Sequence, residues 1–197
     1  PMIRWQDHVA LPPMRSETHY GRSVRCFAER PPSLHAMFRR AVDREPTREA
    51  ISFDGRRWTY AQAETEVDRI AQGFAARGLQ QGQRVVLFIS NRPEFVFVFF
   101  ALQKLGAIAV PVGIREQAPG VAFIANQCGA TGIVFDDALA DRLPAAADAP
   151  GLAWRLPLGE LAALHLTADI PTAAAAVSED DCACILYTSG TTGHPKG

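Results

Sequence analysis

RVVLFISNRPEFVFVFFALQKLGAIAVPV, residues 84–112, decides the fold of this chain. The apolar run VVLFIS is followed by Pro93, which favours the first turn of a helix, and Gly106 is a stop signal for that helix. AIAVPV then forms a second short apolar run. Because parallel strands need a long crossover between them, a strand, a helix and a second strand in this order indicate a parallel sheet.

The same alternation continues towards the C-terminus. Val121, Ile124, Ala125 and Cys128 recur at helical spacing before Gly129, and GIVF at 132–135 is a further strand. Strands that alternate with helices predict an α/β fold with a layered, mostly parallel sheet and helices on both faces. The segment 137–179 is rich in alanine and proline and predicts only short helices and one strand near 152–156.

Short capping and turn motifs predict the helices and the hairpin that precede residue 84. Ser33 is a candidate N-cap for a helix that Pro46 ends. Asp54-Gly55 lies between two strand-like runs and predicts a hairpin with a type I′ turn. Thr59 and Gln62 have the spacing of a capping box at the start of a second helix, which Gly78 ends.

The two ends of this pattern are less regular. Residues 1–32 contain five prolines and no sustained period, so they predict an irregular N-terminal extension in front of a domain over 33–197. Residues 173–181 have the composition of a linker, and the acidic residues 179–181 within it are predicted to be a solvated approach to the next strand.

Composition excludes some classes of function and favours others. Lys and Arg total 20 against 21 for Asp and Glu, so no overall positive field is present to bind nucleic acid or an anionic membrane. The apolar stretch 95–114 is interrupted by polar residues, glycine and proline, and predicts a buried helix and strand rather than a membrane span. With no secretory segment visible, the cytoplasm is the expected compartment. The four cysteines are predicted to be reduced core thiols, and no metal site is assigned.

The last residues carry the clearest chemical signal. CACILY, 182–187, predicts a buried strand, and it leads directly into small and hydroxyl-bearing residues and one lysine. Glycines let the backbone approach a ligand closely, hydroxyls and backbone N–H groups donate hydrogen bonds, and lysine adds a positive charge, as a polyphosphate requires. The spacing excludes a Walker A loop. The predicted phosphate-binding residues are Thr188, Ser189, Gly190, Thr191, Thr192, Gly193 and Lys196.

YTSGTTGHPKG resembles the phosphate-loop signature of the adenylate-forming enzymes, the superfamily of acyl-CoA synthetases, peptide-synthetase adenylation domains and luciferases. RRWTYAQAETEVDRIAQGF is similar to an early helix of that superfamily, and LQKLGAIAVPV to its helix-to-strand motif. Gly113 departs from the pattern, since relatives often have asparagine or aspartate there. The resemblance implies that 33–197 is the incomplete N-terminal part of the large domain of such an enzyme.

That family implies a reaction as well as a fold. Its members use ATP to convert a carboxylic acid into an acyl-adenylate and pyrophosphate, and commonly pass the acyl group to coenzyme A. By resemblance, residues Thr188 to Lys196 would surround the β- and γ-phosphates. The catalytic lysine, the Mg²⁺ ligands and the acid pocket would lie downstream of Gly197, so no catalytic residue is assigned and the chain alone is expected to be inactive.

Three functions remain open on the sequence. The preferred one is a carboxylate-CoA ligase of fatty acid metabolism or of aromatic acids, with ATP, Mg²⁺ and coenzyme A as its requirements. The second is an amino-acid-activating domain of a peptide synthetase, which would deliver to a carrier protein. The third is a non-catalytic nucleotide-binding or interaction module. Nothing in the sequence indicates an oligomeric state.

Overall fold

The computed structural model describes residues 12–167, 172–188 and 196–197 of the chain. Its centre is a four-stranded sheet in the order β6-β5-β7-β8, with every neighbouring pair parallel. The strands are β5 (Arg84–Phe88), β6 (Ile108–Pro111), β7 (Ala130–Phe135) and β8 (Trp154–Pro157). The predicted α/β fold with a parallel sheet is confirmed, and so is the single strand expected near 152–156.

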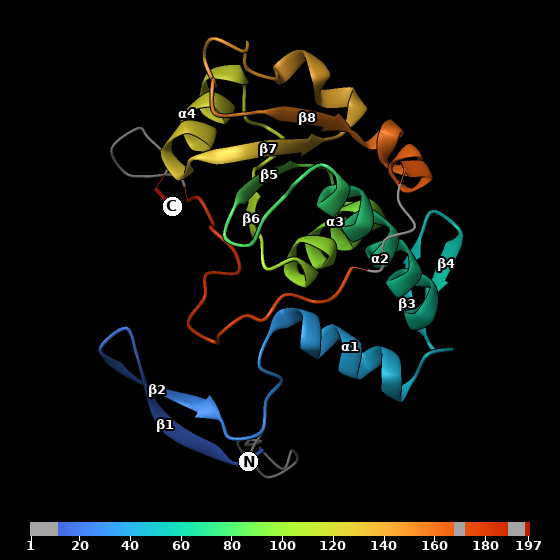
Figure 1. Ribbon diagram of the computed structural model, residues 1–197, viewed down its shortest axis with the longest axis vertical. Helices are drawn as coiled ribbons and strands as arrows, with labels where there is room; N and C mark the ends of the chain where they lie inside the picture. The colour runs from blue at the N-terminus through green and yellow to red at the C-terminus, as the bar shows by residue number, and fades with distance from the viewer. Residues whose placement is uncertain (1–11, 168–171, 189–195) are drawn as a thin grey trace, which may run out of the picture.

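Helices cover both faces of this sheet, as predicted (Figure 1). Val85 and Leu87 of β5 belong to one buried cluster, whereas Val86 and Phe88 belong to the other, because successive side chains of a strand point to opposite faces. The first face packs against α1 (Leu34–Arg44), α2 (Tyr60–Ala76), α3 (Pro93–Lys104) and the 3-10 helix η3 (Leu158–Thr167). The second packs against α4 (Ala118–Cys128) and η2 (Asp137–Arg142).

The predicted caps set where the first helices begin. The Ala36 N–H donates to Ser33 Oγ over 3.0 Å at the start of α1. At the start of α2 the Thr59 N–H donates to Gln62 Oε1 (2.9 Å) and the Gln62 N–H donates to Thr59 Oγ1 (3.2 Å), which is a complete capping box. These bonds satisfy backbone donors that have no partner within a helix.

The hairpin expected around Asp54-Gly55 is also present. It joins β3 (Glu49–Phe53) to β4 (Arg56–Thr59). Asp54 and Gly55 have φ angles of 46° and 74°, both positive as a type I′ turn requires.

The long apolar stretch divides between a helix and a strand. Residues 95–104 belong to α3 and residues 108–111 to β6, with a turn at Gly106 between them. No helix in the described ranges combines the length and the apolar character needed to cross a bilayer.

The N-terminal segment contains regular structure that the sequence analysis missed. β1 (Met14–His19) and β2 (Arg22–Phe27) form an antiparallel hairpin through a turn at Tyr20 and Gly21. The prediction of an irregular extension is therefore wrong for residues 14–27. Both faces of this hairpin are largely exposed, so its sequence has no apolar alternation to reveal it. The domain boundary at residue 33 stays a prediction.

Residues 172–181 are not a detached linker. In Figure 1 they run between α1 and the α3–β6 connection on their way to the C-terminal end. The Ala175 N–H donates to Lys104 O (2.8 Å), and Gln81 Nε2 donates to Ala176 O (3.0 Å). The backbone of this segment is thus attached to the end of α3 and the turn after α2.

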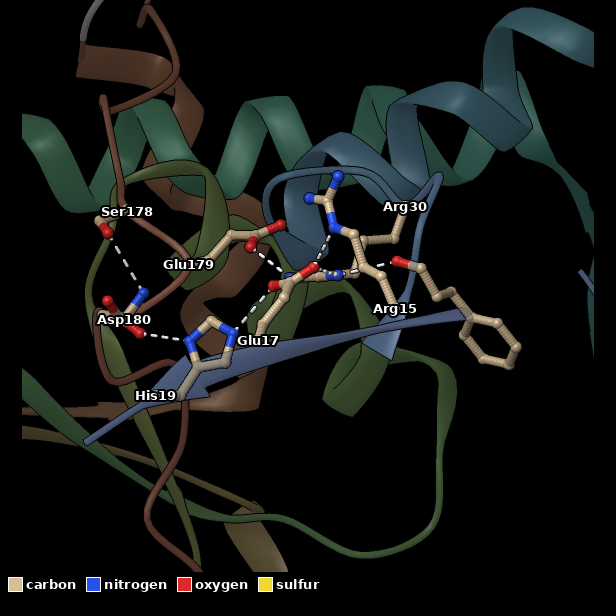
Figure 2. A network of polar contacts seen from close by, with 8 residues as sticks. Arg15, Glu17, His19, Arg30, Ser178, Glu179 and Asp180 are labelled. Atoms are coloured by element: carbon tan, nitrogen blue, oxygen red, sulfur yellow. Dashed lines mark hydrogen bonds and ion pairs between the residues drawn. The ribbon is translucent and has the colours of Figure 1, made fainter. Parts of the chain in front are cut away.

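The acidic residues that follow are exposed, and two of them also form ion pairs. Asp180 Oδ1 lies 2.6 Å from His19 Nδ1, and Arg30 Nη2 donates to Glu179 Oε2 over 2.5 Å (Figure 2). The predicted solvated approach at 179–181 is confirmed by the exposure of these side chains, 58% for Asp180 and 37% for Glu179, but the sequence did not predict their ion pairs. They hold the N-terminal hairpin against a segment about 150 residues away in the sequence.

All four cysteines are free, but none of them is fully buried. Cys182 is exposed, and Cys26, Cys128 and Cys184 are half-buried. The prediction of core thiols is therefore corrected to thiols at the margins of the core. Burial is still sufficient to raise the pKa of the Cys128 and Cys184 thiols above the usual value.

Candidate functional site

Residues 182–187 approach the predicted phosphate loop along the edge of β6. The Ala109 N–H donates to Ala183 O (3.1 Å), and the Ile185 N–H donates to Ala109 O (2.9 Å), which forms a parallel bridge between Ala109 and Cys184. The buried Gln103 side chain adds a bond from Nε2 to Ala183 O (3.0 Å). The segment therefore continues the parallel sheet beyond β6 by one short stretch of pairing.

This segment is only half-buried, which corrects the prediction of a buried strand. Ile185 and Tyr187 pack against the cluster that includes α4, whereas Leu186 is 67% exposed. Burial raises the pKa of the Tyr187 hydroxyl, as expected for a phenol facing the core. Side chains that contact the core thus alternate with an exposed one along residues 185–187. This pattern shows that the segment lies at the edge of the sheet, where only one of its faces contacts the core.

Thr188 and Lys196 form the base of the predicted loop. The Thr188 N–H donates to Lys196 O (2.9 Å), and the Lys196 N–H donates to Thr188 O (3.0 Å). This antiparallel bridge brings together the first and last of the predicted phosphate-binding residues, both of them exposed. The other predicted residues, Ser189, Gly190, Thr191, Thr192 and Gly193, lie outside the described residues.

Gly197 packs directly under the base of the loop, a role the sequence analysis did not assign. A Cβ at this position would lie 2.7 Å from the Tyr187 ring and 3.0 Å from Ile185 Cγ2. Both distances are shorter than ordinary van der Waals contact, so a larger residue would require the Tyr187 and Ile185 side chains to shift. The glycine directly after the lysine was the available sequence signal.

The strand register places the loop base at the carboxyl edge of the sheet. Cys184 is level with Ala109, Ala109 with Val85, and Val85 with Gly132. Four residues further along each strand, Thr188 reaches the same edge as the end of β7. Ligands of open parallel sheets bind outside this carboxyl edge, where the connecting loops gather.

A polar group that the sequence analysis also missed lies on the same edge. Ser90 Oγ donates to Asp136 Oδ2 (2.6 Å), and Arg92 Nη1 lies 3.4 Å from both Asp136 oxygens. Arg92 Nε also donates to Glu94 Oε2 (2.8 Å). Burial alone would raise the pKa of Asp136, but hydrogen bonds from Ser90 and the Ala138 N–H and the charge of Arg92 lower it.

This group supports the edge rather than the loop itself. Asp136 directly follows β7, a strand that is three strand spacings from the 183–187 segment, or roughly 14 Å. It joins the ends of β5 and β7 and the start of α3, and thereby fixes the carboxyl edge. In the sequence, the signal for this polar group was the run Ser90-Asn91-Arg92, which follows the buried strand β5.

Comparison with known proteins identifies the class of protein that this sheet and loop define. The pattern of the AMP-binding enzyme family matches residues 38–197. The chain therefore belongs to the family of AMP-binding enzymes, in agreement with the resemblance found in the sequence.

Individual relatives refine this assignment. The chain is 39% identical over 146 residues to the long-chain-fatty-acid–CoA ligase FadD13 of Mycobacterium tuberculosis, covering 72% of this chain and 29% of the relative. It is 35% identical over 153 residues to a feruloyl-CoA synthase of an Amycolatopsis species, covering 77% and 30%. Among solved structures, the N-terminal domain of FACL13 from Mycobacterium tuberculosis superimposes with a TM-score of 0.78 at 32% identity, covering 84% of this chain and 43% of that one. The chain thus spans about 30% of the length of these curated relatives.

Proposed function

We propose that the protein is an ATP-dependent carboxylate-CoA ligase. The reaction would convert a carboxylic acid and ATP into an acyl-adenylate and pyrophosphate, and then transfer the acyl group to the thiol of coenzyme A. Membership of the AMP-binding family and similarity to relatives named as CoA ligases support this proposal. Residues 33–197 would be the N-terminal part of its adenylation domain.

The bridge between Thr188 and Lys196 is the observation that carries the proposal. It closes the base of a segment rich in glycine and hydroxyl residues at the carboxyl edge of the sheet. In the proposed reaction Thr188, Ser189, Gly190, Thr191, Thr192, Gly193 and Lys196 bind the β- and γ-phosphates. By holding the leaving pyrophosphate, they align the α-phosphate for attack by the carboxylate oxygen.

The remaining requirements are proposed from the class of reaction. Mg²⁺ would neutralise phosphate charge when bound, with ligands expected from a part of the whole protein other than this chain. The acid would be fatty or aromatic, since the relatives are named for a long-chain fatty acid and for ferulate. The free thiols agree with a cytoplasmic location, where cysteines stay reduced.

Two other functions are less well supported. The relatives described above are CoA ligases and not amino-acid-activating domains, which favours coenzyme A as the acceptor. A non-catalytic nucleotide-binding module would keep the loop but would not catalyse exchange between ATP and pyrophosphate. The same assay therefore separates it from a ligase.

The test is acid-dependent exchange of labelled pyrophosphate into ATP by the whole protein, with a panel of fatty and aromatic acids. In Lys196→Ala the exchange rate should fall by about 10²–10³-fold for every accepted acid, because one preorganised charge on the phosphates is lost. Lys196→Arg, which keeps the charge, should retain part of the activity.

Arg57→Ala is the matched control, because Arg57 is an exposed cation on the β3–β4 hairpin, paired with Glu49. It should leave the exchange rate unchanged. If Lys196→Ala altered the order of preferred acids but not the dependence on ATP, the assignment of the loop to phosphate would be wrong. Exchange with none of the acids would overturn the ligase itself.

A further inference from the structure

Three potential metal ligands meet on one face of the N-terminal hairpin. Glu17 and His19 lie two residues apart on β1 and therefore share a face, and Cys26 lies on β2 opposite Arg15, diagonal to Glu17. One carboxylate oxygen, one ring nitrogen and the sulfur atom all lie within 4.8 Å of one another. We propose that Glu17, His19 and Cys26 bind a divalent transition-metal ion, with Zn²⁺ as the best match to this mixed ligand set.

The spacing of the ligand atoms fits such an ion. His19 Nε2 and Glu17 Oε2 are 3.0 Å apart. Two ligands at zinc bond lengths of about 2.0–2.1 Å in tetrahedral geometry are separated by roughly 3.3 Å. An ion can therefore enter between these two atoms after a shift of a few tenths of an ångström, which an exposed hairpin can accommodate.

Asp180 orients the imidazole for this role. Its Oδ1 lies 2.6 Å from His19 Nδ1 on the side of the ring away from Glu17 (Figure 2). Asp180 keeps a proton on Nδ1, so a metal ion that displaces the proton between Nε2 and Glu17 Oε2 meets the lone pair of Nε2. A carboxylate on the other ring nitrogen is the usual second partner of a metal-bound histidine. Asp180 is itself held by Ser178 Oγ, which accepts its N–H over 3.2 Å, and by Tyr20, whose hydroxyl donates to the Asp180 carbonyl.

The arginines beside Glu17 donate mainly to its oxygen that faces away from His19. Arg15 Nε (2.5 Å) and Arg30 Nη1 (3.0 Å) both donate to Glu17 Oε1, the oxygen away from His19. Arg30 Nη2 does donate to Oε2 (2.6 Å), but it also donates to Glu179 Oε2 (2.5 Å) and keeps that partner when Oε2 takes the ion. With the two arginines and the ion carrying four positive charges, the three carboxylates of this network and the Cys26 thiolate carry four negative ones.

The ligands can also be reached from solvent. His19 and Cys26 line a cavity of about 450 Å³ between the hairpin, the start of α1 and residues 177–183. Such a cavity has room for the water that would complete four-coordination. An ion bound here would join β1 to β2, and through Asp180 would hold the hairpin against the segment leading to Thr188.

Cobalt binding to the full chain tests this proposal, since Co²⁺ occupies zinc sites and reports a thiolate ligand by a charge-transfer band. We expect one equivalent of Co²⁺ to bind with this band and Zn²⁺ to displace it. Cys26→Ser should abolish the band. Cys128→Ser, which changes a thiol at the end of α4, should leave the band and the affinity unchanged.

Two further variants keep the test decisive. Asp180→Ala should weaken Zn²⁺ binding by about 10–100-fold, as loss of such a partner does, and His19→Ala should weaken it more. Unchanged far-UV circular dichroism would show that each variant is folded. Absence of saturable Zn²⁺ binding, or a band that survives Cys26→Ser and is lost in Cys182→Ser, would overturn the assignment.

Discussion

The parallel sheet and the N-terminal hairpin are held in place by opposite kinds of interaction. Strand β5 is buried on both faces, and Val85, Val86, Leu87 and Phe88 are 0% exposed. The β1–β2 hairpin is instead held by ion pairs that involve Arg15, Glu17, His19 and Arg30, together with Glu179 and Asp180 (Figure 2). Burial of apolar surface stabilises a fold strongly, whereas ion pairs that keep contact with solvent stabilise it little.

The charges of the hairpin are nevertheless firmly defined. Hydrogen bonds from Arg30, Arg15 and His19 lower the pKa of Glu17 far below its usual range. The same carboxylate raises the pKa of Arg30 above its usual value. The comparison teaches that the hairpin contact specifies where the chain lies without contributing much to the free energy of unfolding. Four substitutions test it, from the largest expected effect to the smallest.

Truncating a core aromatic should have the largest effect. Phe74 of α2 is 0% exposed, and its ring centroid lies 5.7 Å from that of Trp154 on β8. Phe74→Ala should lower the free energy of unfolding by about 3–5 kcal/mol, because it leaves a cavity where α2 meets the sheet. Urea denaturation measures this change. Phe53→Ala, at a site that is 44% exposed, should cost far less, and equal losses would contradict the assigned core.

Removing the capping box should have an intermediate effect. Thr59→Ala deletes the acceptor of the Gln62 N–H and should cost about 1 kcal/mol in the same urea experiment. Thr65→Ala is the matched control, because Thr65 is an exposed residue of the same helix whose hydroxyl bonds only back to Ala61 O. If both variants lost equal stability, the cap would not be what sets the start of α2.

Acidification should lower the free energy of unfolding, because it favours protonation of His35 in the unfolded chain. Burial, followed by the charge of Lys104, lowers the pKa of this α1 side chain below its ordinary value of 6.5. The folded protein therefore binds a proton at His35 less readily than the unfolded chain does. The contribution of the neutral side chain to the free energy of unfolding is complete above pH 6.5 and declines as the pH falls below that value. The urea midpoint measured on both sides of this value should fall on acidification. The fall should be smaller in His35→Leu, and an unchanged slope would show that His35 is not its source.

Breaking the hairpin network should have the smallest effect on global stability. Arg30 links Glu17 to Glu179, so Arg30→Gln should release the hairpin locally. Amide hydrogen exchange over β1 and β2 should become faster, while the urea midpoint stays unchanged. Arg25→Gln, on β2 but outside the network, should change neither. A clear drop in the midpoint for Arg30→Gln would make the hairpin part of the cooperative core.

The elements predicted correctly are those set by neighbouring residues. Ser33, the Thr59–Gln62 pair and the Asp54-Gly55 turn act within three positions of the chain, so their residue types alone state the geometry. Continuous apolar runs similarly predicted a sheet buried on both faces. The hairpin at residues 14–27 was missed because its contacts are polar and distant, and each of its charged residues alone is typical of a solvated surface.

In the candidate site, too, some features could be predicted from neighbouring residues and others could not. The residue types of the loop predict phosphate binding, and the family match extends over these residues. Sequence could not place Gly197 against Tyr187, or Asp136 beside Ser90, because each contact depends on how separate segments pack together. The loop from Ser189 to Gly193 as a phosphate ligand stays a prediction.

The sequence by itself determined the parallel α/β fold, the helix caps and the hairpin turn at residue 54. These depend on short-range backbone geometry and on the period of apolar residues, both of which can be read from neighbouring positions. Only the tertiary structure decided that residues 183–187 lie at the edge of β6 and that Glu179 and Asp180 meet Arg30 and His19. The edge pairing joins positions about 75 residues apart and the ion pairs join positions about 150–160 apart. Both form because burying the two faces of the sheet fixes where each segment must lie.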